Sequence, residues 1–114
     1  MSTGGTWWLV KLAGVSLTAG CASCDRAPVA PRTHTIIIEA MKFGPMPSEV
    51  QAGDVIEWVN RDIFQHTATA RDQSFNIDLA PSASGQTVVK QSGAFPFYCT
   101  YHPGMEGRLV IAGR

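Results

Sequence analysis

From residue 34 onward, apolar and polar residues alternate in short runs, and Gly, Pro, Asp or Ser separate the runs. This period of two, with many β-branched and aromatic residues, is typical of strands. No window of helical length in this part has a 3.6-residue period. The predicted strands span residues 35–39, 55–60, 66–70, 75–79, 86–89, 94–99 and 108–111. Many short strands at near-regular spacing predict an all-β sandwich or barrel.

The first 21 residues have a different pattern. Residues 7–20 (WWLVKLAGVSLTAG) form an apolar run with one charge, Lys11, which is typical of an export signal. The run after Lys11 is too short to span a bilayer. Ala19 and Gly20 before Cys21 resemble a bacterial lipoprotein box, in which the cysteine is lipidated. We therefore expect a signal or lipoprotein leader at residues 1–21, a candidate lipid anchor at Cys21, and a periplasmic or other extracytoplasmic location.

Residues 22–33 are predicted to be a linker, because DRAPVAPRT at 25–33 is polar and rich in Pro and Ala. Cys21 and Cys24 form a CxxC pair. A redox motif of this kind needs a βαβ context, and a structural zinc site needs two further ligands nearby. We interpret the pair as leader residues and assign Cys24 no role. A single β domain is expected at residues 34–114.

Length and charge limit the possible functions of the chain. The 114 residues are enough for one small domain. The net charge is zero, so the chain lacks the basic footprint of a nucleic-acid-binding protein. From residue 34 onward there are six Lys and Arg against eight Asp and Glu. This mild acidic excess predicts only weak electrostatic steering of partners.

Four soft or borderline metal donors stand out in the β domain. The segment YCTYHPGM at 98–105 carries Cys99, His102 and Met105 at three-residue intervals, and His66 opens an upstream predicted strand. One thiolate, two imidazoles and a thioether suit a single copper ion that cycles between Cu(I) and Cu(II). In such a site the thiolate and two nitrogens form a trigonal plane, and the methionine sulfur is a long axial contact.

Other interpretations of these donors remain open. Zinc accepts the same ligands, although structural zinc sites more often use several thiolates. A two-copper centre needs a second cysteine in the loop, and a nucleophilic Cys99 needs an oriented base and an oxyanion hole. Taken singly, Cys99 would usually be a small buried hydrophobe and Met105 core filler. Their combination in one loop favours a metal site.

Two segments, YCTYHPGMEGRLVI and MKFGPMPSEVQAGDVIEWVNRDIFQHTATA, resemble the cupredoxins, or blue copper proteins. The second segment is similar to the small plastocyanin/amicyanin branch, and the Cys-x2-His-x2-Met spacing resembles the short loop of the amicyanin type, since plastocyanin-type loops are longer. The resemblance covers about residues 34–112 and implies a Greek-key β-sandwich, one type 1 copper ion, and a monomeric one-electron carrier rather than an enzyme. It also implies redox partners such as a c-type cytochrome or a dehydrogenase.

The resemblance implies roles for the individual donors. Cys99, His66 and His102 would be the equatorial ligands and Met105 the axial one. His66 would be buried, and His102 would lie near the surface as the electron port. Met41 and Phe64, with Pro103 and Gly104, would form an apolar docking patch, unless Met41 and Phe64 belong to the core.

Two residues depart from the pattern of these relatives. Thr67 stands where an Asn usually ties the two ligand loops together. Its hydroxyl can still bond, and its N–H could point at the Cys99 sulfur. Tyr101 stands where a proline is usual. Since proline has no N–H, we hypothesise that the Tyr101 N–H donates to Cys99 Sγ and raises the reduction potential.

Two alternatives to electron transfer come from other functional classes. A copper-trafficking or storage module would bind Cu(I) tightly without useful cycling, and Met41 and Met46 offer it extra thioethers. A purely structural β-sandwich would contain the four donors by coincidence. A reversible reduction potential discriminates the carrier from the first, and visible colour from the second.

Overall fold

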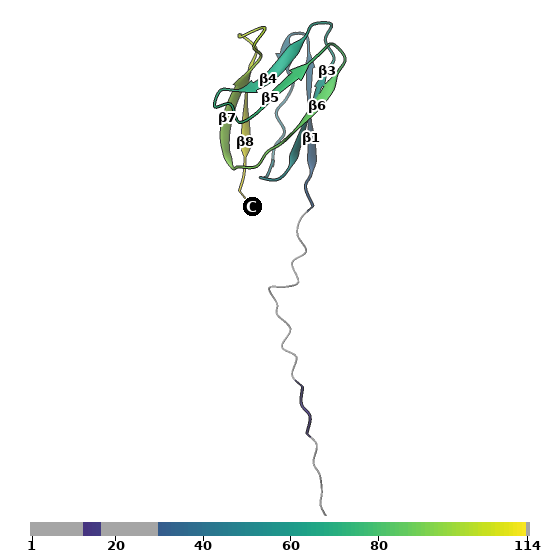
Figure 1. The fold of residues 1–114 in the computed structure, drawn as a ribbon, viewed down its shortest axis with the longest axis vertical. Coiled ribbons are helices and arrows are strands. Elements are labelled where there is room, and N and C mark those ends of the chain that lie inside the picture. The colour runs from purple at the N-terminus through teal and green to yellow at the C-terminus, as the bar shows by residue number, and fades with distance from the viewer. Residues whose placement is uncertain (1–12, 17–29, 114) are drawn as a thin grey trace, which may run out of the picture.

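The computed structural model describes residues 13–16 and 30–113, and it folds the chain from residue 33 into eight strands (Figure 1). They are β1 (Thr33–Glu39), β2 (Lys42–Phe43), β3 (Val55–Asn60), β4 (His66–Ala70), β5 (Asn76–Leu79), β6 (Ser84–Val88), β7 (Gly93–Tyr98) and β8 (Glu106–Ile111). The described residues include no helix that could cross a membrane. The predicted leader and linker, with Cys21 and Cys24, lie almost wholly outside the described residues.

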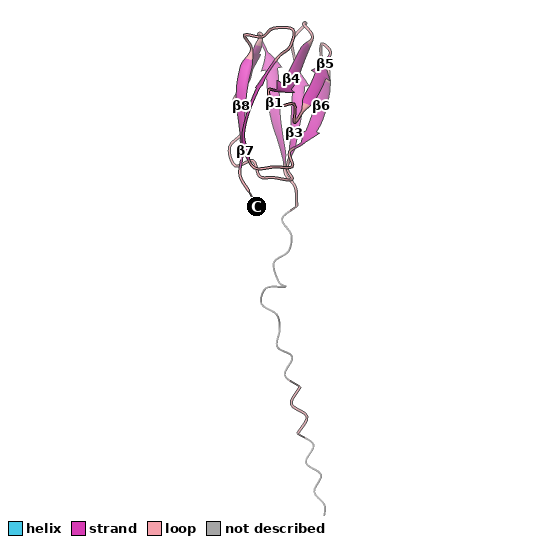
Figure 2. Ribbon diagram, turned by 60° about the vertical axis from the view of Figure 1, so that its left-hand side comes forward, coloured by secondary structure: helices cyan, strands magenta, loops and turns pink. Residues whose placement is uncertain are grey.

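The strands form two four-stranded sheets that pack face to face (Figure 2). One sheet has the order β2-β1-β3-β6 and the other β5-β4-β7-β8. Strands β1 and β3 are parallel, and the other paired strands are antiparallel. The chain passes from one sheet to the other after β3, after β5 and after β6. Such crossings are typical of Greek-key sandwiches, so the predicted fold class is confirmed.

Alternation along each strand builds the core between the sheets. In β3, for example, Ile56, Trp58 and Asn60 are buried while the residues between them are only half-buried. Trp58 and Phe97, one from each sheet, are both fully buried and meet edge to face with ring centroids 5.2 Å apart. Burying each such side chain stabilises the fold by about 1.5–3 kcal/mol. Packing across the sheets therefore holds the strand ends in fixed positions.

The sandwich has two unlike ends. The end of β3, the start of β4, the end of β7 and the start of β8 meet at one end, which we call the donor end and which lies at the top of Figure 1. The start of β1 lies at the opposite end, where Thr33 is aligned with Val55. There, the buried Asp54 carboxylate accepts hydrogen bonds from the N–H groups of Gln51 and Arg32, both at 3.0 Å.

Candidate metal centre

Three of the predicted ligands converge at the donor end. His66 is the first residue of β4, whereas Cys99 and His102 lie in the loop between β7 and β8. Cys99 Sγ lies 3.7 Å from His66 Nδ1 and 3.7 Å from His102 Nδ1. One donor atom from each of the three residues lies within 4.8 Å of the other two. Residues 33 positions apart in the chain thus meet because β4 and β7 are neighbours in one sheet.

The two sulfur–nitrogen separations fit a single small metal ion. Nitrogen and thiolate ligands lie about 2.0 and 2.3 Å from an ion such as zinc. With about 120° between the bonds of a trigonal plane, two such atoms are about 3.7 Å apart. The observed distances of 3.7 Å agree with this value. A plane of one thiolate and two imidazoles is the donor set typical of a blue copper site.

The loop after β7 is held by its own backbone. The His102 N–H donates to the Cys99 carbonyl at 3.3 Å, and the Met105 N–H donates to the His102 carbonyl at 2.8 Å. The Cys99 N–H in turn donates to the Met105 carbonyl at 3.0 Å. These turns bring the buried Met105 back beside Cys99. The role of Met105 as axial ligand stays a prediction.

The donors differ in their access to solvent. His66 and Cys99 are fully buried, whereas His102 is half-buried. The two imidazole rings lie with centroids 5.1 Å apart. This contrast agrees with the expectation of an interior histidine and a histidine near the surface. Solvent or another protein would therefore approach the centre through the His102 side.

Thr67 ties the two ligand-bearing segments together, as its position predicted. Its N–H donates to Cys99 Sγ at 3.3 Å. Its hydroxyl oxygen accepts the Thr100 N–H at 2.9 Å and lies 3.2 Å from the Thr100 hydroxyl. Thr67 is only 4% exposed, so water competes poorly for these bonds. A single threonine thus fixes β4 to the loop after β7.

The prediction that the Tyr101 N–H donates a hydrogen bond to Cys99 Sγ was wrong. Among the described residues, the backbone donor to Cys99 Sγ is Thr67, and Tyr101 makes no such bond. The bond from the His102 N–H to the Cys99 carbonyl makes Tyr101 a central residue of a turn. The Tyr101 side chain is 53% exposed.

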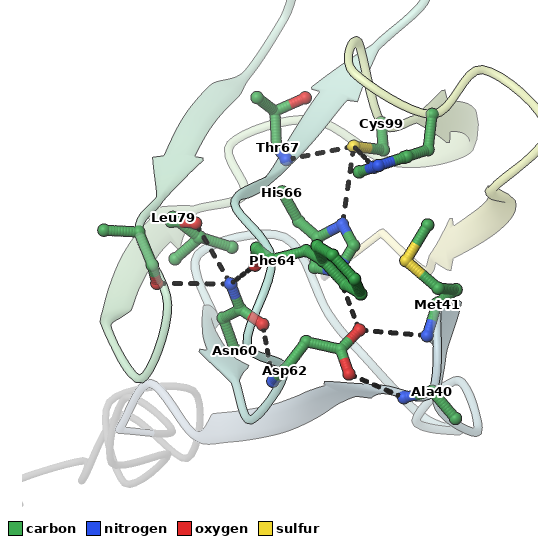
Figure 3. Close-up of polar contacts among 11 residues, drawn as sticks. Ala40, Met41, Asn60, Asp62, Phe64, His66, Thr67, Leu79 and Cys99 are labelled. Carbon is green, nitrogen blue, oxygen red and sulfur yellow. Dashed lines mark hydrogen bonds and ion pairs between the residues drawn. The ribbon is translucent and has the colours of Figure 1, made fainter.

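The structure also reveals a carboxylate that the sequence analysis missed. Asp62 Oδ2 lies 2.7 Å from His66 Nε2 (Figure 3). The same carboxylate accepts the N–H groups of Ala40 and Met41, both at 2.9 Å. The Met41 N–H, followed by the His66 ring, holds the pKa of Asp62 below its usual value, although burial opposes the shift. The only feature of the sequence that could have pointed to Asp62 is its position four residues before His66, a candidate ligand.

The apolar surface at this end differs in part from the expected patch. Phe64 is 49% exposed, and its ring centroid lies 6.3 Å from that of His102. Its neighbour Ile63 is 82% exposed. Met41 instead packs against the core. Phe64 lies beside His102, and Ile63 and Tyr101, the exposed chain neighbours of Phe64 and His102, add apolar surface. We call Ile63, Phe64 and Tyr101 the His102 patch.

Comparisons with known proteins agree with this fold and donor set. The sequence model of the family described as "Cupredoxin-like domain" matches residues 11–111. The chain is 22% identical over 80 residues to amicyanin from Paracoccus versutus, which covers 65% of this chain and 61% of that protein. It is 24% identical over 100 residues to amicyanin from Paracoccus denitrificans, which covers 75% of this chain and 70% of that protein.

Solved structures give the same picture of the fold. A Cu(I) structure of an amicyanin variant superposes with a TM-score of 0.63 at 20% identity, covering 69% of this chain and 81% of the other. At that identity the likeness supports the fold and not a particular partner. The convergence of His66, Cys99 and His102 is an independent observation from this chain's own side chains.

Proposed function

We propose that this chain, which belongs to the cupredoxin-like family, holds one type 1 copper ion and carries single electrons between redox proteins rather than acting as an enzyme. In this proposal His66, Cys99 and His102 are the equatorial ligands and Met105 is the axial ligand. The observation that carries the proposal is the pair of 3.7 Å separations between Cys99 Sγ and the two Nδ1 atoms.

Bound copper would supply a one-electron couple between Cu(I) and Cu(II). The protein's part is to hold the donors still and to exclude water. Both His66 and Cys99 are fully buried, and Thr67 fixes the segments that carry them. Because each donor is tied to packed strands or to a closed turn, little rearrangement is needed when the charge of the centre changes.

The half-buried edge of His102 is the proposed route for the electron. The His102 patch offers exposed apolar side chains, with Phe64 beside the His102 ring, which suits the small, short-lived interfaces of electron-transfer partners. The partner class that we propose is a c-type cytochrome or a dehydrogenase. The mild acidic excess of the domain adds only weak steering.

We place this activity outside the cytoplasm, with a leader at residues 1–21, a linker at 22–33 and the copper domain at 34–114. The apolar run before Cys21 supports this arrangement. Thr33 starts β1 at the end opposite the donors. The linker would therefore join the copper domain at the end opposite His102. The proposed carrier is a monomer.

The rival function is copper trafficking or storage. Its extra thioethers would come from Met41 and Met46, but both pack against the core. This packing favours the carrier. A carrier shows a reversible reduction potential and fast electron exchange between its oxidised and reduced forms, whereas a storage module holds Cu(I) without either property.

The port is tested by the rate of electron self-exchange in the copper-loaded full chain. Ile63→Lys places a cation in the His102 patch, and Val88→Lys places one at an exposed position at the other end of the sandwich. We expect Ile63→Lys to slow self-exchange on the order of tenfold at low salt, because two positive patches must meet. Val88→Lys should have little effect. Equal rates for the two variants would contradict His102 as the port.

A further inference from the structure

The contact between Asp62 and His66 determines which ring nitrogen faces the sulfur. An ionised carboxylate only accepts hydrogen bonds, and Asp62 Oδ2 lies 2.7 Å from His66 Nε2. The hydrogen of a neutral His66 ring must therefore sit on Nε2. The lone pair of Nδ1 then points toward Cys99 Sγ, 3.7 Å away. The ring is thus presented as a ligand before any ion arrives.

The same carboxylate holds a second structural element. Its Oδ1 accepts the Ala40 N–H and its Oδ2 accepts the Met41 N–H. Ala40 and Met41 form the turn between β1 and β2 and have positive φ angles of 53° and 60°. Residues with a side chain rarely adopt such angles, so the turn needs support from outside. Asp62 gives the turn this support, and its Oδ2, which accepts the Met41 N–H, is also the oxygen that contacts His66.

Asp62 is itself held in place by the neighbouring Asn60. The Asn60 side chain, which is 1% exposed, accepts the Asp62 N–H at 2.9 Å through its oxygen. Its NH2 group donates to the carbonyls of Phe64 and Leu79, at 2.8 and 3.1 Å. Figure 3 shows these bonds as one connected set from Asn60 through Asp62 to His66 and Cys99. The carboxylate therefore has little freedom to turn away from His66.

We propose that Asp62 is the positioning residue of this centre: it fixes the tautomer and orientation of His66, adds negative charge to the donor set, and couples His66 to the β1–β2 turn. The proposal rests on the proposed function only for its effect on copper. Carboxylates that accept a hydrogen bond from a ligand histidine raise the basicity of the ligand. The negative charge favours Cu(II) over Cu(I), since the more highly charged ion gains more from it.

Three variants of the full chain test this inference. Asp62→Asn removes the charge and leaves one acceptor oxygen for three donors. Asp62→Glu keeps the charge and the acceptors. Asp78→Asn is the matched control, because Asp78 is an exposed carboxylate on the neighbouring strand β5 that binds Gln65 and not a ligand.

The first readout needs no copper. In the metal-free wild-type chain, ¹⁵N NMR of the imidazole should show the hydrogen of His66 on Nε2. In Asp62→Asn the Nδ1–H form should appear, and the amides of Ala40 and Met41 should exchange faster with solvent. A wild-type His66 with its hydrogen on Nδ1 would overturn the inference, even if a variant failed to fold.

The second readout is the reduction potential and the Cu(II) affinity of the copper-loaded chain. Asp62→Asn should raise the reduction potential and weaken Cu(II) binding about 10- to 100-fold, while Asp62→Glu restores most of both. Asp78→Asn should change Cu(II) binding less than about twofold, because solvent screens exposed charges. Equal potentials in Asp62→Asn and Asp78→Asn would reject the tuning role. A wild-type chain that binds no copper would instead reject the proposed function and leave the tautomer result standing.

Discussion

Replacing Thr67 with valine removes one hydroxyl while keeping the shape of the side chain. The hydroxyl oxygen accepts the Thr100 N–H at 2.9 Å, and this bond ties β4 to the loop that carries Cys99 and His102. Leaving a buried N–H without a partner costs about 1–3 kcal/mol. Because the Thr100 side of the bond is exposed, water recovers part of this loss. We therefore expect the free energy of unfolding to fall by about 1–2 kcal/mol.

The assay is urea unfolding of the metal-free full chain, so that loss of the loop tie is not mixed with loss of copper. Thr67→Ser keeps the hydroxyl and should lose less. Thr35→Val makes the same chemical change at an exposed position on β1, where the hydroxyl has a weak contact of 3.5 Å to Glu57. It should stay within about 0.5 kcal/mol of wild type. If Thr67→Val also stayed within that limit, the tie would have no energetic role.

Two further predictions concern packing and pH. Gly107→Ala should destabilise the chain by about 1–3 kcal/mol, because its Cβ would lie 2.3 Å from the buried Phe97 ring; Gly104→Ala, which meets nothing within 4 Å, should cost much less in the same urea experiment. Hydrogen bonds, led by the Gln51 N–H, hold the pKa of Asp54 well below its usual value, so its stabilising contribution is complete above about pH 4 and is lost as the pH falls further. The free energy of unfolding, measured from about pH 6 to pH 2, should therefore fall more steeply in wild type than in Asp54→Asn. Parallel curves of this free energy against pH would contradict the role assigned to Asp54.

The sequence was sufficient for most of the fold because its signals were local. Alternating burial in β3 follows directly from VIEWVN, and all seven predicted strands occur, with ends that differ by at most two residues. Strand β2 was missed because Lys42–Phe43 has only two residues, too few to show a period. Its existence depends on antiparallel pairing with the end of β1, which is a property of the folded chain.

The candidate site was predictable where donor chemistry alone decides. A thiol, two imidazoles and a thioether identify themselves by residue type, and the structure brings His66, Cys99 and His102 together. The residues around them were harder to predict. Asp62 is an ordinary residue type whose importance comes from the 2.7 Å contact with His66 Nε2. The Tyr101 prediction failed because N–H direction depends on turn geometry, which residue type does not determine.

The central claim is that Cys99 and the two histidines form a redox-active copper site. The most direct test is the visible absorption spectrum of the full chain titrated with Cu(II), recorded beside Cys99→Ser. We expect an intense blue band in wild type that reaches its maximum at one equivalent, bleaches with ascorbate and is absent from the variant. A colourless wild-type chain, or a blue band that persists in Cys99→Ser, would contradict the account.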